Sequence, residues 1–589
     1  MHVIATAGHV DHGKSALLRA LTGMEPDRWA EERRRGMTID LGFVWTRLPA
    51  VGDIAFVDVP GHERLVGNML AGAGPVPAVL FVVAADQGWQ PQSEEHLSIL
   101  DALGVRHGVL AVTRSDLADP AAARAQALAR IAESSLGKVP SVDVSAVTGQ
   151  GLDALRDALV LLAGELPLPD HEADVRLWVD RAFTVRGHGT VVTGTLGAGT
   201  LRVGDRLQLA RDGALLRVRG LECLKEPRQE AGAVARVAVN VSGPGAGTPV
   251  RGDALLTPDR WLTTDTVDVR LRGDPASGLP RELTLHLGSA AVPVTVRPLG
   301  ADTARLRLGT SLPLRVGDGA LLRDPGRHSV PAGVTVLDVR PPRLTRRGAA
   351  AVRDEELREA DAAGELRRRG LIRRPELLAM GVTPPAEPVT GEWLADPDHW
   401  ASLRERLGAV VEEHATRHPL DPGLPLEAAR QALGLPERSL VEALLARSPE
   451  LRYSEGRLYG SQARPTLPPR IAAAVEAVRA DLAQQPFRAP EADRLAELGL
   501  DAKLLAAAEA AGALLRIDRQ IVLLPGADAE AAAVLAGLEQ PFTAGQARRA
   551  LDTTRRVAIP LLEYLDRHGR TERLDGTLRR CRDTGGDTR

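Results

Sequence analysis

The sequence predicts a multidomain chain with an α/β P-loop domain first, two β-barrel domains next and an array of winged-helix (α+β) domains last. Three observations support this order. The 589 residues are too many for one hydrophobic core. The pattern of apolar residues changes in kind twice, near residues 173 and 343. A segment of the last part is repeated, as in modular arrays.

Residues 1–172 alternate short apolar runs with amphipathic stretches that have a helical period. Strands that are apolar at every position are typical of a parallel sheet whose two faces are both covered by helices. We therefore expect a single α/β domain in this part of the chain. The apolar runs that predict its strands are 3–6, 54–59, 78–85, 108–112 and 141–144.

From residue 173 the chain changes to short alternating strands interrupted by glycines, as in the segment 190–209. A second set of such strands spans 264–339 and ends at Pro341-Pro342. Short strands with closely spaced turn signals predict barrels or sandwiches. We interpret the two sets as two small β-barrels, with boundaries at 173–262 and 263–342.

After Pro342 the chain becomes rich in Ala, Leu, Arg and Glu, and helical periods return. The tripeptide Gln-Pro-Phe at 485–487 recurs at 540–542, and each copy precedes two helical stretches and a hairpin. Asp575-Gly576 is a favoured two-residue hairpin turn. Three helices followed by a hairpin is the winged-helix plan. The four units that we expect are 343–398, 399–465, 466–525 and 526–589.

The composition excludes several classes of protein. Two cysteines, Cys223 and Cys581, are too few for a disulfide framework or a four-cysteine zinc site. No apolar run approaches the roughly 20 residues that cross a bilayer, and the first residues lack the pattern of a signal peptide. We therefore expect a cytoplasmic chain without a membrane partner. With four lysines against 70 arginines, a cluster of arginines is a weaker signal than usual.

The strongest motif lies at residues 8–15, where Gly-His-Val-Asp-His-Gly-Lys-Ser fits the phosphate-binding pattern G-x-x-x-x-G-K-[ST] between a strand and a helix. Glycines let backbone N–H groups wrap around phosphates, and the N-terminus of the following helix adds positive potential. Lys14 would bridge the β- and γ-phosphates, and the Ser15 hydroxyl would bind Mg²⁺. The residues expected to hold the nucleotide here are Asp11, His12, Gly13, Lys14 and Ser15.

Four residues elsewhere predict hydrolysis of the bound nucleotide. Asp58 stands at a strand end, where a carboxylate holds Mg²⁺, and the Gly61 amide would contact the γ-phosphate. His62 follows and would orient the attacking water as the catalytic residue. Upstream, Thr38 offers a second hydroxyl to Mg²⁺, on a segment that is ordered only while the γ-phosphate is present.

Guanine is indicated by residues 113–116 and 145–146. The Asp116 carboxylate can accept two hydrogen bonds from the guanine edge, which adenine cannot supply. Arg114 stands where lysine is usual and Thr113 where asparagine is commoner, and a planar guanidinium can also stack on the base. Ser145-Ala146 offers a backbone N–H to the guanine oxygen. Together these motifs predict an α/β P-loop GTPase domain that binds GTP and GDP with Mg²⁺.

Residues 8–15 and 58–62 resemble the phosphate and switch motifs of translational GTPases of the EF-Tu type, which also carry two β-barrels after the GTPase domain. Within that group, residues 35–43 and 180–195 resemble the SelB family, whose bacterial members carry four winged-helix units. The resemblance implies an elongation factor that binds selenocysteyl-tRNA, docks on a hairpin of the messenger RNA and delivers selenocysteine to the ribosome at UGA codons. GTP hydrolysis, stimulated by the ribosome, would release the tRNA, and we expect a monomer.

The same resemblance implies an aminoacyl pocket at Asp180, Arg181 and Arg236. Selenols are more acidic than thiols, so the side chain of the cargo is an anion at neutral pH. Desolvated arginines favour such an anion over the neutral side chain of serine, and Asp180 would orient one of them.

The last winged unit is the expected reader of the messenger hairpin. Arginine side chains bind phosphates and stack on exposed bases, and their positions on helices and wing would cluster them on one side. In an arginine-rich chain the same residues are also compatible with a solvated surface. The arginines concerned are Arg548, Arg549, Arg555, Arg556, Arg573, Arg579 and Arg580.

Two other functions are compatible with the GTPase motifs. One is a different tRNA-carrying GTPase of the EF-Tu type, and the other is a regulatory GTPase with a nucleic-acid-binding tail. The repeated winged units argue against a general tRNA carrier and against a GTPase that regulates a metabolic enzyme. A preference for hairpin RNA over duplex DNA would separate the SelB-like function from a DNA-binding regulator.

Overall fold

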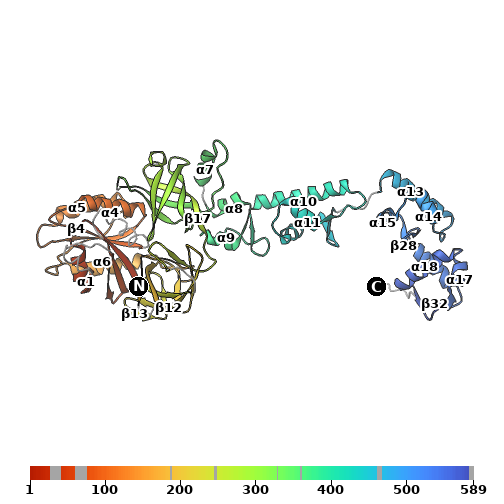
Figure 1. Ribbon diagram of the computed structural model, residues 1–589, viewed down its shortest axis with the longest axis horizontal. Helices are drawn as coiled ribbons and strands as arrows, with labels where there is room; N and C mark the ends of the chain where they lie inside the picture. Colours follow the sequence, from red (N-terminus) through yellow and green to blue (C-terminus); the bar gives the residue numbers. More distant parts are fainter. Residues whose placement is uncertain are drawn as a thin grey trace. The chain divides into compact units, whose positions relative to one another are not determined.

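The computed structural model describes residues 1–26, 41–59, 76–185, 189–243, 248–327, 329–358, 361–460 and 467–582. The chain divides into two compact units, Met1–Glu387 and Pro388–Arg589 (Figure 1). The predicted fold class is confirmed, because an α/β domain, two antiparallel β domains and winged-helix units follow one another along the chain. Among the described residues, no helix is both long enough and apolar enough to cross a membrane.

The α/β domain is built on a six-stranded sheet in the order β2-β3-β1-β4-β5-β6. Its first strand in this order is antiparallel to its neighbour, and the other five are parallel, so the predicted parallel sheet has one antiparallel edge that the sequence did not indicate. The strands are β1 (His2–Ala7), β2 (Gly42–Leu48), β3 (Gly52–Asp58), β4 (Ala78–Ala84), β5 (His107–Thr113) and β6 (Ser141–Asp143).

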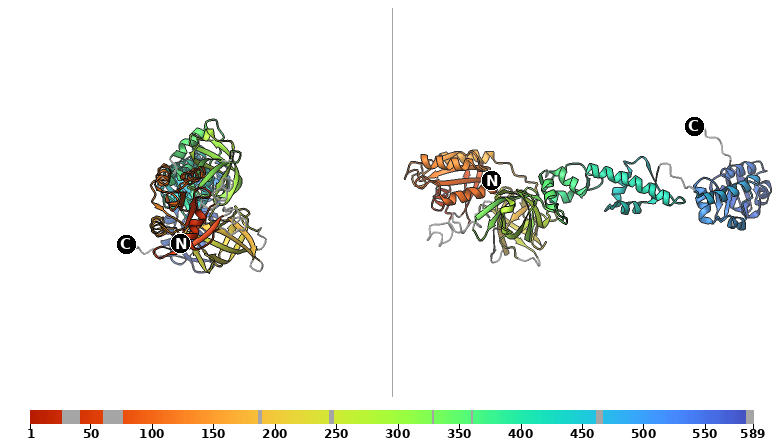
Figure 2. Two further views of the ribbon diagram at one scale, coloured as in Figure 1. Left: turned by 90° about the vertical axis from the view of Figure 1, so that its left-hand side faces the viewer. Right: turned by 90° about the horizontal axis from the view of Figure 1, so that it is seen from above.

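Helices cover both faces of this sheet (Figure 2). Leu17 and Leu159 pack on one face, and Leu97 and Ile131 pack on the other. Every residue of β4 is therefore buried, which explains why its sequence is apolar without alternation. The helices are α1 (Lys14–Thr22) and α6 (Leu152–Glu165) on the first face, and α4 (Pro91–Ala102) and α5 (Ala121–Ala132) on the second.

The second domain is an eight-stranded antiparallel sheet that curls around its own core. Burial alternates along β15, since one face meets the core and the other does not. The Asp180 N–H donates to the Thr193 carbonyl at 2.9 Å, which extends the pairing of β8 with β9 to the residue before β8. Its strands are β7 (Arg176–Trp178), β8 (Arg181–Val185), β9 (Gly189–Leu196), β11 (Arg206–Leu209), β12 (Leu215–Cys223), β13 (Glu226–Arg228), β15 (Ala235–Ser242) and β16 (Ala254–Leu256), beside a separate pair, β10 (Thr200–Arg202) and β14 (Glu230–Gly232).

The third domain is a closed barrel with the strand order β17-β20-β19-β18-β21-β22. Closure removes exposed sheet edges, so that every strand is paired on both sides. A short 3₁₀ helix, η2 (Ala276–Gly278), precedes β18. The strands are β17 (Thr263–Gly273), β18 (Glu282–Leu287), β19 (Ala290–Pro298), β20 (Thr303–Pro313), β21 (Gly319–Asp324) and β22 (Ser329–Asp338).

A buried ion network attaches the next helix, α7 (Ala349–Arg358), to this barrel. Arg353 is only 1% exposed, and its Nε donates to Asp268 at 2.7 Å while another guanidinium nitrogen reaches Asp338. Asp268 also accepts from Arg305 at 2.6 Å. Burial of unpaired charges would be costly, so these partners stabilise one another. The same unit continues with α8 (Ala362–Arg369), β23 (Leu371–Arg373) and α9 (Arg374–Ala379).

The C-terminal unit contains winged-helix folds. The first combines three helices with a three-stranded sheet, one strand of which lies between the first two helices. After the short strand β24 (Trp393–Ala395), its elements are α10 (Pro397–Arg417), β25 (Leu424–Pro425), α11 (Leu426–Leu433), α12 (Arg438–Leu445), β26 (Leu451–Ser454) and β27 (Arg457–Gly460). The next contains α13 (Pro469–Gln484), α14 (Ala492–Glu497), α15 (Ala502–Ala510), β28 (Leu515–Asp518) and β29 (Ile521–Leu523). The last contains α16 (Ala527–Ala536), β30 (Phe542–Thr543), α17 (Ala544–Ala550), α18 (Arg555–Arg567), β31 (Thr571–Arg573) and β32 (Leu578–Cys581), and it shares one hydrophobic core with the preceding fold.

Candidate functional site

The phosphate-binding motif forms a tight loop between β1 and α1. Gly8 has a φ of 129°, and a Cβ at this position would lie 2.2 Å from the Val82 carbonyl oxygen. Gly13 has a left-handed conformation with a φ of 84° at the start of α1. Only glycine adopts both conformations without strain and without collision, which explains the two fixed glycines of the motif.

The Lys14 side chain lies back over this loop and is mostly buried. Its Nζ donates to the carbonyl oxygens of Gly8 at 3.0 Å and of His9 at 2.8 Å. The ammonium group is therefore held at the loop that the sequence assigns to the phosphates.

Two of the predicted magnesium ligands lie together. Asp58, at the end of β3, is fully buried, and one of its carboxylate oxygens accepts from the Ser15 hydroxyl at 2.8 Å. The other oxygen accepts from Thr6 Oγ1 at 2.7 Å. Carboxylate and hydroxyl oxygens are the ligands that Mg²⁺ prefers, so these residues fit the ion. The third predicted ligand, Thr38, lies outside the described residues, as do Gly61 and the predicted catalytic residue His62.

The base-recognition segment is linked directly to the phosphate loop. The Thr113 hydroxyl donates to the His12 carbonyl at 2.7 Å. Arg114 has a positive φ of 57°. Its guanidinium donates to Asp86 at 2.9 Å and to the Asp11 carbonyl. The two unusual residues of this segment therefore both connect it to the phosphate loop.

The remaining residues of the predicted base site lie on neighbouring turns. The Ser115 N–H donates to the Val144 carbonyl at 3.3 Å, which joins the turn after β5 to the segment before Ser145 and Ala146. The Ser145 hydroxyl accepts from the Thr148 N–H at 3.1 Å and shapes the turn that contains Ala146. Asp116 is exposed, so its carboxylate is open to a base.

Sequence reasoning missed two residues that contact the phosphate loop from α4. His96 Nδ1 accepts from the Gly8 N–H at 3.0 Å, and Gln92 Oε1 accepts from the Val10 N–H at 2.9 Å. Burial lowers the pKa of His96 to about 3, and burial lowers the pKa of His12 in the loop to about 4. Both imidazoles are therefore neutral at pH 7. The only signal in the sequence is that Gln92 and His96 are four residues apart and therefore lie on the same side of the helix.

The three predicted aminoacyl-pocket residues also lie together. Arg236 on β15 donates to both carboxylate oxygens of Asp180, one of them at 2.8 Å, and to the Thr193 hydroxyl at 3.2 Å. Asp180 is buried and also accepts from Thr193 at 2.7 Å. Arg181, the next residue in the chain, donates to the Leu41 carbonyl at 2.6 Å. Asp180 therefore holds Arg236 in one orientation.

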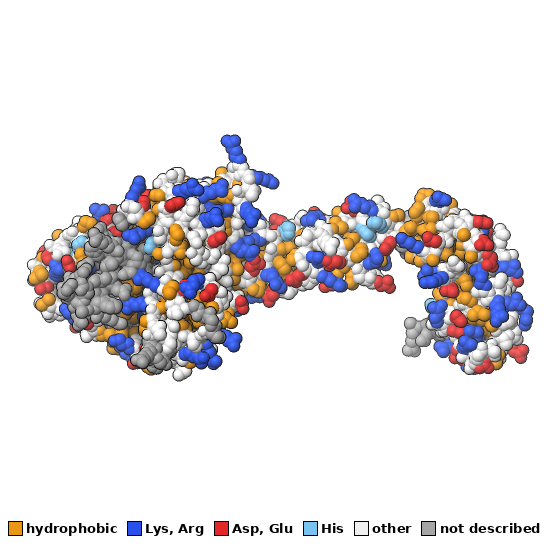
Figure 3. Space-filling view, viewed as in Figure 1, with side chains coloured by type: hydrophobic (Ala, Val, Ile, Leu, Met, Phe, Trp, Pro, Cys, Tyr) orange, Lys and Arg blue, Asp and Glu red, His pale blue; other side chains and the backbone are white. Residues whose placement is uncertain are grey.

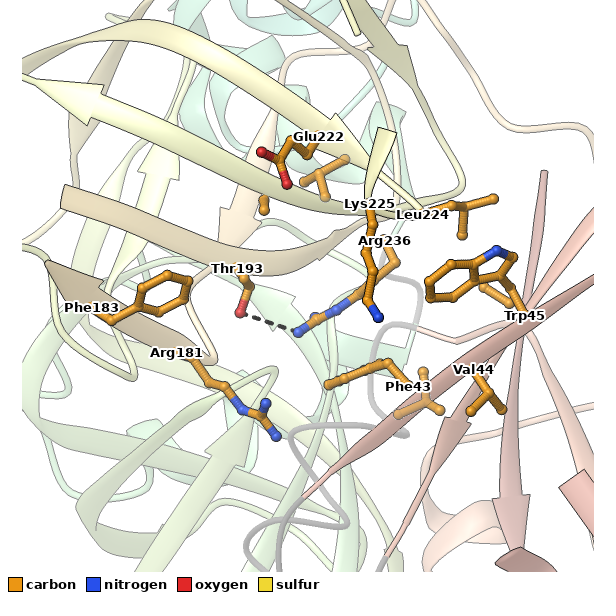
Figure 4. Close-up of a pocket in the computed structure, with 14 residues that line it drawn as sticks. Phe43, Val44, Trp45, Arg181, Phe183, Thr193, Glu222, Leu224, Lys225 and Arg236 are labelled. Carbon is orange, nitrogen blue, oxygen red and sulfur yellow. Dashed lines mark hydrogen bonds between the residues drawn. The ribbon is translucent and has the colours of Figure 1, made fainter. Parts of the chain in front are cut away.

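These arginines line a hollow of about 220 Å³ between the α/β domain and the second domain. The Arg236 Cζ lies 3.8 Å from the centroid of the Phe43 ring, and the Arg181 Cζ lies 5.5 Å from it. Lys225 Nζ lies 5.5 Å from the Trp45 ring. Figure 4 shows Arg236 and Lys225 extending from the second domain towards these aromatic rings of β2. The hollow thus combines cationic and aromatic groups.

The predicted RNA-binding arginines of the last winged fold have different environments. Arg548 and Arg549 on α17 and Arg555 at the start of α18 are exposed, and no carboxylate within the described ranges forms an ion pair with them. Arg573 is also exposed, but it donates to the carbonyls of its own turn, at Asp575 and Gly576.

Three other arginines of the predicted set have partners in more distant parts of the fold. Arg579 is 7% exposed and pairs with Asp566 at 2.9 Å. Arg556 donates to the Ala489 and Pro490 carbonyls at 2.9 Å and so joins the last two winged folds. Arg580 pairs with Glu572. Figure 3 shows acidic side chains interspersed among the basic ones on the visible face of this region.

Comparisons with known proteins agree with this geometry. The family model of the elongation factor Tu GTP-binding domain matches residues 1–164, and that of the elongation factor SelB winged helix matches residues 533–580. A selenocysteine-specific elongation factor of Escherichia coli (strain K12) is 32% identical, over 97% of this chain and 97% of that protein. Another, from Desulfomicrobium baculatum, is 37% identical over 57% of this chain, and the match spans about half, 55%, of that protein.

A solved structure of a related elongation factor is similar over nearly the whole chain. The crystal structure of a bacterial selenocysteine-specific elongation factor, EF-Sec, superimposes with a TM-score of 0.74 at 25% identity, covering 99% of this chain and 100% of that chain. The E. coli relative and this structure match nearly their whole length, including the winged-helix region. The chain therefore belongs to the family of selenocysteine-specific elongation factors, which are GTPases of the elongation factor Tu type.

Proposed function

We propose that the chain carries selenocysteyl-tRNA in its GTP-bound state, docks on a hairpin in the messenger RNA and delivers selenocysteine to the ribosome at UGA codons. GTP hydrolysis on the ribosome then releases the tRNA. The observation that carries the proposal is the hollow in which Asp180 orients Arg236 beside Arg181 and Phe43. The activity belongs in the cytoplasm, and we expect the chain to act as a monomer.

The nucleotide site is proposed to work through its own polar groups. Lys14 moves from the loop carbonyls to the β- and γ-phosphates when GTP binds, because phosphate oxygens are stronger acceptors than neutral carbonyls. Ser15, Asp58 and Thr38 would hold Mg²⁺, which supplies charge neutralisation of the phosphates. His62 would orient the attacking water, and the Gly61 amide would contact the γ-phosphate.

Guanine recognition is assigned to Asp116, with Ser145 and Ala146 closing the other side of the base. Thr113 and Arg114 support this assignment, since their bonds to the phosphate loop fix the position of the turn that carries Asp116. Arg114 stabilises the site through Asp86 and Asp11 in addition to any stacking on the base.

Recognition of the cargo follows from charge. A selenolate that binds beside Arg181 and Arg236 exchanges its hydrating water for two guanidinium groups. The site is partly buried, so the attraction between these opposite charges is stronger there than in water. The neutral hydroxyl of serine offers no charge to Arg181, and Arg236 then has only Asp180 as its anionic partner. The aromatic ring of Phe43 keeps the site partly dry.

We assign binding of the messenger hairpin to the last winged fold. The contacts would be made by its exposed arginines, Arg548, Arg549, Arg555 and Arg573. Phosphate contacts of this kind supply affinity that depends on salt, whereas the bases of an RNA loop supply specificity.

The test measures protection of aminoacyl esters from hydrolysis. Selenocysteyl-, seryl- and a third aminoacyl-tRNA are incubated with the purified chain and GTP, GDP or ATP. We expect slower hydrolysis only for selenocysteyl-tRNA with GTP. Equal protection of seryl-tRNA, equal protection with GDP, or a requirement for ATP would each contradict the proposal.

A further inference from the structure

Helix α4 contacts the phosphate loop with one end and the closed barrel with the other. Near its start, Gln92 and His96 accept the backbone N–H groups of Val10 and Gly8. At its end, Asp101 and Ala102 lie against the barrel. The helix therefore connects two parts of the Met1–Glu387 unit that are more than 200 residues apart in sequence.

The contact at the phosphate loop depends on a particular state of His96. The side chain is almost fully buried, and its Nδ1 accepts a hydrogen bond, so the ring is neutral and its proton is on Nε2. The Gly8 N–H is buried in the same place, and a buried donor without a partner is destabilising. Loss of the His96 acceptor would therefore favour a different path of the loop.

The contact at the barrel is a close approach of backbones. A Cβ on Gly333 of β22 would lie 2.3 Å from the Ala102 carbonyl oxygen and 2.8 Å from the Ala102 Cα. Arg272 of β17 donates to the Asp101 carbonyl at 3.2 Å. Ile99 of the helix and Leu321 of β21 belong to the same hydrophobic cluster. These contacts leave little freedom for the end of α4 to move without the barrel.

We propose that Gln92 and His96 are positioning residues of the nucleotide site, and that α4 transmits the position of the barrel to the loop that holds the phosphates. The proposal rests on the assignment of residues 8–15 to GTP made above. A helix of 12 residues is about 18 Å long and moves as a rigid body. A displacement of its end at Ala102 therefore also displaces Gln92 and His96. The two side chains then pull on amides at the start of the loop, upstream of Lys14 and Ser15.

The first experiment measures the dissociation rate of fluorescently labelled GDP from the full chain by stopped flow. Replacement His96→Ala removes the acceptor, and we expect release about threefold to tenfold faster, the effect of one net hydrogen bond. His96→Asn is the matched control, because its Oδ1 is as many bonds from the backbone as the histidine Nδ1. The rate of this variant should return towards that of the unchanged protein. Gln92→Leu should accelerate release to a similar extent.

The second experiment tests transmission from the barrel. Gly333→Ala should alter the release rate at least twofold, because its methyl group forces β22 and α4 apart. Gly278→Ala is the control in the same domain, since a Cβ there meets nothing within 4 Å. Arg272→Ala, which removes the hydrogen bond to Asp101 without a collision, provides a second variant if Gly333→Ala fails to fold.

The outcomes are distinguishable. Failure of the unchanged protein to bind GDP would refute the assigned nucleotide site. If GDP binds but His96→Ala and His96→Asn release it equally fast, His96 is not a positioning residue through its acceptor. If neither Gly333→Ala nor Arg272→Ala changes the rate, transmission through α4 is refuted. Return of the release rate in His96→Asn would support positioning, since a purely packing role of the ring would not be restored by the smaller side chain.

Discussion

The proposed aminoacyl pocket and the last winged fold are both rich in arginine, but the surroundings of these arginines differ. In the pocket, Asp180 forms a bidentate ion pair with Arg236. The guanidinium group lies next to Phe43 and lines a hollow. In the winged fold, Arg579 is buried and forms an ion pair with Asp566, whereas Arg548 and Arg549 are exposed. The number of arginines in a region therefore says little about its ligand. Both Arg236 and Arg579 are paired with a carboxylate, so an adjoining hollow, together with burial and the nearest carboxylate, decides whether a guanidinium also faces an anion.

The largest expected effect concerns the buried arginine of the winged fold. Arg579→Ala leaves Asp566 without its partner, and we expect a loss of about 3 kcal/mol in the free energy of unfolding of the last two folds. Hydrogen exchange of the α18 amides in the full chain measures it. Arg580→Ala is the control, because Arg580, which pairs with Glu572, is exposed and its pair should contribute much less to stability. Equal losses in the two variants would remove the distinction between a buried and an exposed arginine ion pair.

The pocket arginines should affect selectivity, and removal of Arg236 should also lower the stability of the second domain, because it leaves the buried Asp180 without its ionic partner. In the double variant Arg181→Ala with Arg236→Ala, the preference for selenocysteyl- over seryl-tRNA should fall by about 2–3 kcal/mol, as expected for hydrogen bonds to a charged group. The affinity for GTP should stay the same. Ester-protection assays with both tRNAs measure the preference. Arg211→Ala, whose partner is Asp253 in the same domain, is the control. Unchanged discrimination would refute the pocket assignment.

The exposed arginines should show the salt dependence that the pocket lacks. Arg548→Ala and Arg549→Ala should each lower the affinity for a cognate hairpin by about 1 kcal/mol and reduce the slope of log K against log salt by about one. Filter-binding titrations of the full chain at several salt concentrations measure both quantities. Arg580→Ala should leave them unchanged, because Glu572 already neutralises this side chain. A slope that is insensitive to Arg548 and Arg549 would argue for a solvated surface.

The smallest expected effect concerns the aromatic ring of the pocket. Phe43→Leu keeps an apolar side chain but removes the ring beside the Arg236 guanidinium, an interaction worth about 0.5–1 kcal/mol. We expect a two- to fivefold loss of preference for selenocysteyl-tRNA in the ester-protection assay. A larger loss in Phe43→Leu than in the double arginine variant would show that exclusion of water, and not charge, dominates recognition.

Much of the fold followed from periodicity. Strands without alternation predicted the covered sheet, and β4 is buried at every position. The antiparallel edge strand β2 was missed, because its apolar run, 43–45, is only three residues long and is followed by the polar pair Thr46-Arg47. The second domain and the closed barrel share the same glycine-punctuated pattern, and the pattern contains no information on which of the two sheets closes by continuous pairing.

The residues of the candidate site also fall into two groups, those that a local sequence pattern predicts and those that only long-range contacts reveal. The phosphate motif is local, since its glycines and Lys14 act within eight residues, and the sequence was sufficient to find it. Gln92 and His96 act on backbone groups 82 and 88 residues away, so no local spacing could identify them. Thr113 and Arg114 looked like departures from the usual guanine-binding residues, whereas in space they bond to the loop 101 and 103 residues upstream.

By itself, the sequence determined the order of domains, the nucleotide-binding loop and the kind of base it accepts, because each depends on period, turn geometry or spacing within a short segment. Only the tertiary structure decided which arginines are engaged and which are available. Ion pairing depends on distances of a few ångströms between residues remote in the chain, such as Asp180 and Arg236. The same reason separates Arg579 from Arg549, two arginines that no local feature of the sequence tells apart.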